Sequence, residues 1–473
     1  MLIRGFLILI AAYWTGYWIA GLAVAVLLLV WALLGSGEGP PVLALALTYQ
    51  WMQVTIGIFY SALTGVELEA FYTTDWQRMV LIGLAWITCL AVAIFYGIVL
   101  TRRRVIPPEH APMSAFNNKI LYAAYGGSLL LTGVIQEIAW NYSSFTQAIL
   151  AITYAHLGLL FVMTRRFTRP VFQWEKLIGV MALEVAMGFT GYFAGFREPL
   201  VMGAIAVFEV FNRRDIRHWA FAAGLAGILG MSSLVWVSVR GQVRQEIDDD
   251  VLSSSRVERF DRVRTLSSGL LTQGPSDYAD ASNLLIDRLW AIKYPGMALE
   301  RVPFLIPHTD GQILKDALVH IVTPRFLYPE KPDLVSDSEL VRKYAGAQVA
   351  GSESNTSIAF GYAAESYVDY GLPWMFVPVI IFGLLVGATY QMWTSVIQHR
   401  DLAVAITTVL YWLTLYLFER SWAKMLGLSV TLMVYLGGLV YLVDQWLLMR
   451  RAKMLTSGHM DHIIDTAAST STT

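Results

Sequence analysis

The sequence predicts an all-α polytopic membrane protein with about 11 transmembrane helices, in a range of about 10 to 12. The first observation is composition, since 56% of the 473 residues are hydrophobic and only 15% are charged. The second is a mean hydropathy of +0.53. A water-soluble domain of this length carries more charge, so the apolar excess is expected to face lipid. The third is a series of apolar runs long enough to cross a bilayer.

A crossing needs about 20 apolar residues, and the expected spans follow in chain order. They are residues 5–33, 41–64, 77–100, 119–139, 144–164, 173–194, 197–211, 218–239, 372–395, 401–418 and 424–448. Gly16 interrupts the first run, which is therefore expected to be one tilted helix or a broken one. It is too long for a cleavable signal peptide, and no small-residue cleavage site follows it closely. The seventh run is short, which indicates a helix that begins inside the fold.

Five basic clusters set the expected orientation, because lysine and arginine accumulate in short cytoplasmic loops. They are Thr101–Val105, Thr164–Arg169, Asn212–His218, Gln398–Arg400 and Met449–Lys453. With the spans above, all five fall on one side of the membrane, which places the C-terminus in the cytoplasm. The break in the first span leaves the side of the N-terminus open.

These spans divide the chain into four expected parts. They are an N-terminal bundle (1–239), an extracytoplasmic, periplasmic loop (240–371), the last three spans (372–450) and a disordered cytoplasmic tail (451–473). The loop is expected to be mostly helical. Within it, residues 283–304 have an apolar side that includes Leu284 and Trp290. Such a pattern is typical of a helix that lies along a membrane surface, here as a lid.

Several classes of function are disfavoured by composition. The net charge of −1 gives no global basic field for nucleic acid. Cys89 is the single cysteine, which excludes an intrachain disulfide and disfavours a thiolate metal site. Neither a dinucleotide-binding glycine fingerprint nor a P-loop is found. The acidic run Asp248–Asp250 lies in a polar helical stretch away from the arginines discussed below, so no metal and no cofactor are expected.

Arginines occur at three junctions on the expected outer side. Arg197 lies in "GFREPL", Arg325 in "TPRFLYPEKPDL" and Arg420 in "FERSW". Each has a structural alternative: a snorkelling arginine paired with Glu198, a proline-stiffened loop, and an interfacial anchor beside Glu419. Independent anchors have no reason to share one side, however. Because guanidinium binds phosphate oxygens bidentately and stays charged in a low dielectric, the three together indicate a site for a lipid-linked anion.

The same residues carry a resemblance to a known family. "TPRFLYPEKPDL", followed by "SNTSIAFGYAAESYVDYGLPWM", resembles the signature of the Wzy-type O-antigen polymerases, which are oligosaccharide repeat-unit polymerases. The "GFRE" junction and the "FERSW" turn are also similar to features of that family. Phe196 departs from the pattern, because it is bulkier than the residue usually found before the arginine. The resemblance covers the multispan plan and the large outer loop.

The resemblance implies a metal-independent glycosyltransferase of the GT-C kind in the bacterial inner membrane, with its active site facing the periplasm. It implies that the growing glycan leaves undecaprenyl diphosphate and joins the next undecaprenyl-diphosphate-linked unit, in lipopolysaccharide or exopolysaccharide biosynthesis. The implied partners are the lipid-linked donor and acceptor and the bilayer. A chain-length regulator and a flippase are further partners that the resemblance allows.

Candidate site residues follow from the chemistry and the resemblance together. Arg197, Arg325 and Arg420 are expected to stabilise charge that develops on a diphosphate leaving group. Glu365, aligned with the family's Glu-x-Tyr, is the expected general base; the alternative is that it caps a helix or pairs with an arginine. The expected substrate-binding residues are Arg288, His308, Tyr328, Lys331 and Tyr367.

Two other functions stay open at this level. A ligase of the O-antigen-ligase type shares the broad architecture and is the nearest enzyme alternative. A transporter or flippase for a lipid-linked sugar is the alternative outside enzymes. Transporters are expected to show mid-span ionisable residues and internal repeats. Here Glu184 and Glu209 are the main charges well inside spans, and no repeat is found, which favours the enzyme.

Overall fold

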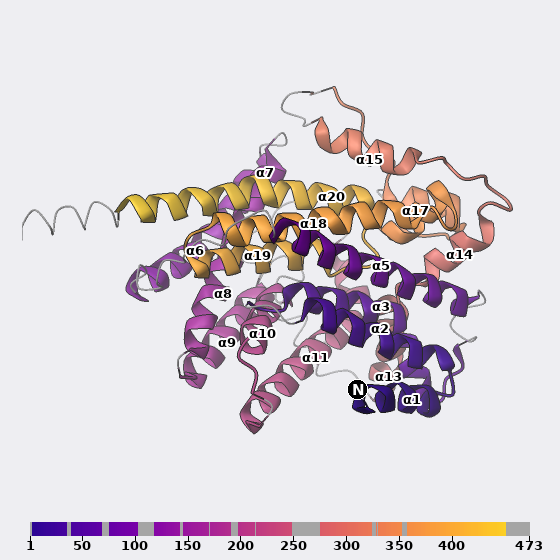
Figure 1. Ribbon diagram of the computed structural model, residues 1–473, viewed down its shortest axis with the longest axis horizontal. Helices are drawn as coiled ribbons and strands as arrows, with labels where there is room; N and C mark the ends of the chain where they lie inside the picture. Colours follow the sequence, from indigo (N-terminus) through magenta and orange to yellow (C-terminus); the bar gives the residue numbers. More distant parts are fainter. Residues whose placement is uncertain are drawn as a thin grey trace, which may run out of the picture.

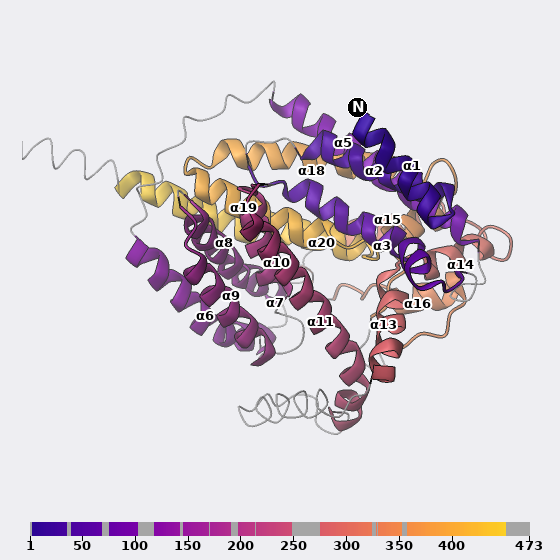
Figure 2. The ribbon, with the colours of Figure 1, turned by 90° about the horizontal axis from the view of Figure 1, so that it is seen from below.

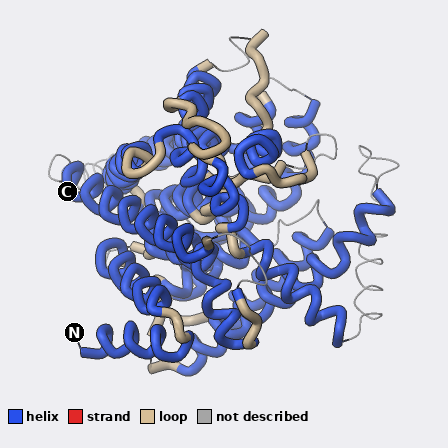
Figure 3. Tube along the Cα trace, turned by 90° about the vertical axis from the view of Figure 1, so that its right-hand side faces the viewer, coloured by secondary structure: helices blue, strands red, loops and turns tan. Residues whose placement is uncertain are grey.

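The computed structural model describes most of the chain, and its regular elements are helices (Figure 3). The described residues are 2–35, 39–68, 75–102, 118–141, 145–169, 171–190, 197–212, 214–247, 275–323, 328, 330–351 and 357–450. No strand occurs among them. The predicted all-α class is therefore confirmed.

The first half of the chain supplies most of the bundle. Its helices are α1 (Leu2–Thr15), α2 (Trp18–Leu34), α3 (Val42–Thr64), α5 (Trp76–Arg102), α6 (Asn118–Asn141), α7 (Thr146–Thr153), α8 (Ala155–Thr168), α9 (Trp174–Thr190), α10 (Arg197–Phe208) and α11 (Ile216–Ile247).

Shorter helices follow, and then the last long ones. They are α13 (Pro275–Leu289), α14 (Lys293–Arg301), α15 (Gln312–Val322), α16 (Asp337–Leu340), α17 (Tyr362–Tyr370), α18 (Phe376–Val396), α19 (Arg400–Leu415) and α20 (Trp422–Thr431). A π-helical turn, Leu432–Gly437, continues α20, so that one helical span runs from Trp422 to Arg450.

Five helices of the described chain are long and apolar enough to cross a membrane. They are Val42–Thr64, Trp76–Arg102, Thr146–Thr168, Phe376–Val396 and Trp422–Arg450. Each coincides with an expected span, and together they are consistent with a membrane protein. Helix α6, although it has 24 residues, is not among the five.

The expected number of eleven spans is not supported. The first expected span forms two helices, α1 and α2, because the chain breaks at Gly16 with a φ of +73° that favours glycine. Helix α19, which is bounded by described residues at both ends, has 16 residues, fewer than the roughly 20 that a bilayer requires. Within the described residues, apolar composition thus indicates more crossings than the helices support.

The central helix pair, α5 and α18, runs side by side along the long axis of the molecule (Figure 1). Small residues allow this close approach. A Cβ atom at Gly387 would lie 2.1 Å from the carbonyl oxygen of Ile94, and one at Gly97 would lie 2.4 Å from that of Leu384. The two backbones are thus in contact, which makes this pair a rigid support for the rest of the bundle.

Part of the segment predicted as an outer loop packs against the helical bundle. Trp290 is 1% exposed, and its indole N–H donates to the carbonyl oxygen of Val54 in α3 at 2.8 Å. Gly57 leaves room for the indole, because a Cβ there would lie 2.3 Å from the ring. Residues 248–274 lie outside the described part. Helix α13 contacts α3 and α11 (Figure 2).

Candidate functional site

The site is built on the turn between α19 and α20, residues 416–421. The backbone N–H of Phe418 donates to the side-chain oxygen of Gln53 in α3 at 2.8 Å. The N–H of Tyr362, which begins α17, donates to the carbonyl oxygen of Arg420 at 2.7 Å. Both ends of the turn are therefore fixed, and the residue between them, Glu419, has a defined position.

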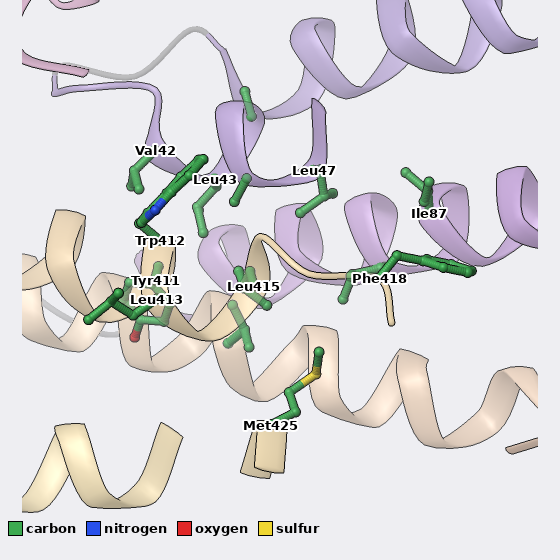
Figure 4. Close-up of a cluster of buried hydrophobic side chains, with 14 of the residues drawn as sticks. Val42, Leu43, Leu47, Ile87, Tyr411, Trp412, Leu413, Leu415, Phe418 and Met425 are labelled. Carbon is green, nitrogen blue, oxygen red and sulfur yellow. The ribbon is translucent and has the colours of Figure 1, made fainter. Parts of the chain in front are cut away.

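Apolar packing and a glycine support the same turn. Phe418 lies in one cluster of buried side chains with Leu47, Ile87 and Met425 (Figure 4). Gly361 has a φ of +94°, and a Cβ there would lie 2.7 Å from the carbonyl oxygen of Phe418. Only glycine satisfies both the conformation and the space at this position.

Cations from four elements act on the Glu419 carboxylate. They are Arg197 at the start of α10, Arg288 in α13, Arg420 in the turn and Lys424 in α20. Burial raises the pKa of Glu419, while the four cations oppose that shift. The structure thus brings three of the expected arginine and substrate-binding positions together around one carboxylate.

Arg197 is the first residue of α10 and is exposed. It lies close enough to the Tyr49 hydroxyl of α3 to interact with it. The positive end of the helix dipole adds to its charge, which suits an anion. The charges of Arg197 and Arg420 lower the pKa of the neighbouring carboxyl group, Glu198. Burial has the larger effect, so the pKa is raised.

Arg420 is held by backbone carbonyls rather than by an acid. Its guanidinium donates to the carbonyl oxygen of Leu413 and, at 3.4 Å, to that of Thr414. It also lies over the Tyr416 ring, 5.4 Å from the centroid. These contacts fix the plane of the guanidinium, and among the described residues no carboxylate lies in hydrogen-bond contact with it.

The site differs from the other ionic cluster of the bundle in how its charges are paired. In that cluster Arg165 donates to both carboxylate oxygens of Glu209, at 2.8 and 3.0 Å, and also binds Asp401. Within the described chain, neither Arg197 nor Glu419 forms a salt bridge shorter than 4.0 Å. Arg197 and Glu419 therefore lie close without being neutralised by direct contact, whereas the Lys424 ammonium lies 2.6 Å from Oδ2 of Asp337.

Glu365, the expected base, is 1% exposed. Its Oε2 accepts the backbone N–H of Trp422 at 2.7 Å, at the start of α20. Burial raises its pKa to about 8, helped by the neighbouring carboxylates Asp337 and Asp369. This geometry corresponds to the helix-capping alternative, and the arginines are not among the charges that act most strongly on it.

The remaining expected residues have varied positions. Arg325 lies outside the described residues, as do Phe196, the acidic run Asp248–Asp250 and the tail 451–473. Tyr328 is exposed. The ammonium group of Lys331 donates to the carbonyl oxygens of His320 and Thr323 at the end of α15, the latter at 2.8 Å.

His308 and Tyr367 have structural partners. The ring Nδ1 of His308 lies 3.2 Å from the carbonyl oxygen of Val368. The hydroxyl of Tyr367, which is 4% exposed, donates to the carbonyl oxygen of Val302 at 2.9 Å. The two rings meet edge to face at 5.7 Å. These contacts join α17 to the chain that leads into α15.

Sequence reasoning missed two members of the site. Lys424 lies four residues after Arg420, in the first turn of α20, so "FERSWAK" contains a second cation close in sequence to the turn. Tyr49 stands inside an apolar run, where nothing in the sequence distinguishes it from an interfacial aromatic residue. Among the residues that the structure describes, no group of three or more His, Cys, Asp or Glu side chains is placed to hold a metal ion.

Comparison with known proteins gives one family. Residues 47–392 match the family described as a domain of unknown function, DUF8712. The match includes Arg197, Arg288 and Glu365, and it ends before the turn that carries Glu419 and Arg420. No curated protein and no solved structure matches the chain. Because the match covers most of its length, the chain belongs to the DUF8712 family.

Proposed function

We propose that the protein polymerises lipid-linked oligosaccharide units and transfers the growing glycan from undecaprenyl diphosphate to the next lipid-linked unit. The observation that carries the proposal is the group of Arg197, Arg288 and Arg420 around the α19–α20 turn, charged but not paired in direct contact. Arginine and diphosphate are complementary in charge and geometry. The resemblance of the 324–375 region to repeat-unit polymerases supports the choice of substrate.

The chemistry explains why cations are useful at this position. Breaking the glycosyl–phosphate bond leaves negative charge on the diphosphate. Cations that are already fixed stabilise that charge more in the transition state than in the ground state. Arg420 is fixed by the carbonyl of Leu413 and the Tyr416 ring, so its guanidinium needs little reorganisation when the lipid binds. Arg197 is exposed at the start of α10, where it interacts with Tyr49.

The proposed setting is the bacterial inner membrane, with the site facing the periplasm. With the spans expected from the sequence, the five basic clusters fall on the side opposite the arginine junctions, which supports this orientation. Lipid-linked units that have crossed the membrane reach the site from that side. Under this proposal Arg325 adds a further phosphate contact, and Tyr328, which is exposed, contacts sugar.

The test is the lipid-linked sugar profile of a deletion strain. Single repeat units on the surface lipid support a polymerase. Polymer that remains on undecaprenol identifies a ligase, and undecaprenyl-linked units trapped inside identify a flippase. Complementation with Arg197→Ala or Arg420→Ala is expected to leave single units, while Arg214→Ala restores polymer. Arg214 is a matched control, because it is exposed and follows the opposite end of α10.

One observation favours a transporter as the second candidate. Glu184 of α9 accepts a hydrogen bond from Tyr125 and lies 3.0 Å from Nε2 of His156. Intramembrane ionisable groups often belong to a transport pathway. Glu184→Gln should therefore block passage of lipid-linked units if the protein is a flippase. A polymerase is expected to retain its product in this variant.

A further inference from the structure

Glu419 is the carboxylate on which the cations of the candidate site act. Its neighbours in the chain are fixed by the hydrogen bonds from Phe418 to Gln53 and from Tyr362 to Arg420. A Cβ on Gly361 would lie 3.2 Å from its Cα, so the backbone of the turn cannot move toward α17. Glu419 is partly exposed as a residue, and its carboxylate makes no hydrogen bond or salt bridge with another described side chain.

We propose that Glu419 is the general base of the transfer, taking the proton from the acceptor hydroxyl beside the arginines that bind the diphosphate. This inference rests on the proposed function. It assigns the base to the turn that carries Arg420 rather than to the buried Glu365. A base must lie within hydrogen-bond reach of the hydroxyl it deprotonates, and Glu419 is the carboxylate that shares its surroundings with Arg197, Arg288 and Arg420.

The step balances without a metal or redox partner. The acceptor oxygen forms a bond to the anomeric carbon of the donor glycan while the bond from that carbon to the diphosphate oxygen breaks. The electron pair leaves with the undecaprenyl diphosphate, which Arg197 and Arg420 stabilise. The hydroxyl proton passes to Glu419 and from there to the departing diphosphate or to water, which returns the carboxylate.

Substrate binding itself improves the base. In the free protein, Arg197, Arg288, Arg420 and Lys424 favour the ionised form of Glu419. A bound diphosphate adds negative charge among these cations and offsets their effect, so the carboxylate gains affinity for a proton as the donor arrives. A carboxylate that is a weak base alone thus becomes a stronger one in the complex.

Glu365 is less suited to this role. It is 1% exposed, and its Oε2 is already used by the N–H of Trp422. The charged groups that act on it are Asp337, Asp369 and Lys424. Glu365 is therefore influenced by two other carboxylates, whereas Glu419 is influenced by three arginines. An acceptor sugar would have to displace the start of α20 to reach it.

The experiment compares Glu419→Gln with wild-type protein in nanodiscs. Turnover is measured with lipid-linked units extracted from the deletion strain, and binding with undecaprenyl diphosphate. Transfer is expected to fall at least about 100-fold, while binding is equal or tighter because a competing negative charge is lost. The residual rate should also lose its rise with pH. Tyr49 is a titratable group on which Glu419 acts, and Glu198 and Tyr416 interact with the same arginines; all three remain in the variant.

Two further variants keep the test decisive. Glu419→Asp retains the charge and is expected to recover part of the rate, which a purely structural role does not predict. Glu300→Gln removes an exposed carboxylate at the end of α14 and should behave as wild type. Should Glu419→Gln fail to fold, the assignment stands on Glu419→Asp, which must then be slower than wild type with binding intact.

The outcomes separate this inference from the function on which it rests. Wild-type transfer by Glu419→Gln, with binding that still depends on Arg197, overturns the base assignment and leaves the polymerase proposal intact. Wild-type protein that neither binds undecaprenyl diphosphate nor extends the units overturns the polymerase proposal itself. Slow transfer with retained binding supports both.

Discussion

Replacing Glu365 with glutamine should change how the stability of the protein depends on pH. Burial raises the pKa of Glu365 from 4.5 to about 8. Between these values the folded protein binds a proton that the unfolded chain has released. Stability is therefore fully present below about pH 4.5 and is lost as the pH rises toward 8. Glutamine keeps an oxygen for the Trp422 N–H but has no proton to lose.

The size of the effect follows from the shift. Each pKa unit corresponds to about 1.4 kcal/mol, so a shift from 4.5 to about 8 costs the wild-type protein on the order of 5 kcal/mol above pH 8. The two proteins should be equally stable near pH 4.5. At pH 9 the Glu365→Gln variant should be the more stable by several kcal/mol.

The assay is thermal unfolding in detergent, followed by tryptophan fluorescence at pH 5, 7 and 9. The difference between the two proteins cancels the contribution of every other titratable group. Glu339→Gln is the control, because Glu339 is exposed on α16. Parallel melting temperatures for wild type and Glu365→Gln at all three pH values would refute the reasoning. Unchanged stability together with slow transfer would return Glu365 to the role of base.

Four further substitutions test individual supports. Gly361→Ala should destabilise the protein by about 1–3 kcal/mol, since φ is +94° and the added carbon would meet the turn; melting and turnover should fall together. Gly387→Ala should cost about 1–3 kcal/mol by separating α5 from α18, with turnover per folded molecule unchanged. Arg165→Ala leaves the buried Asp401 carboxylate without its ion-pair partner and Glu209 with Arg169 alone, so a loss of about 3–5 kcal/mol is expected, measured by urea titration. Arg197→Lys keeps the positive charge but removes the guanidinium that can bind a phosphate bidentately, so binding of undecaprenyl diphosphate should weaken roughly tenfold. Full affinity would show that bidentate binding is not used.

Much of the helical content could be predicted from the sequence, because long apolar runs form helices whose side chains are buried in lipid or in the protein core. The five long spans were found within a few residues of their bounds. The number of crossings was not, since a run such as that of α10 is apolar for packing against neighbours rather than for contact with lipid. Trp290 shows the same limit, because its burial against Gly57 depends on tertiary contacts 233 residues apart.

The site was predicted in part. Arg197, Arg288 and Arg420 act on the Glu419 carboxylate from α10, α13 and the α19–α20 turn, which the sequence suggested only through a shared side. The role of Glu365 could not be separated from capping without the position of Trp422. Glu419 was visible only as a neighbour of Arg420, and its four cations come from elements that no local pattern connects.

The most direct test of the central claim is the affinity of the purified protein for undecaprenyl diphosphate in nanodiscs. The proposal predicts binding that weakens with salt and falls at least about 100-fold, roughly tenfold for each lost charged contact, in the Arg197→Ala, Arg420→Ala double variant. The Arg214→Ala control should bind as wild type does. Equal binding by the double variant and the wild-type protein, with both folded, would contradict the claim that these arginines form a lipid-diphosphate site.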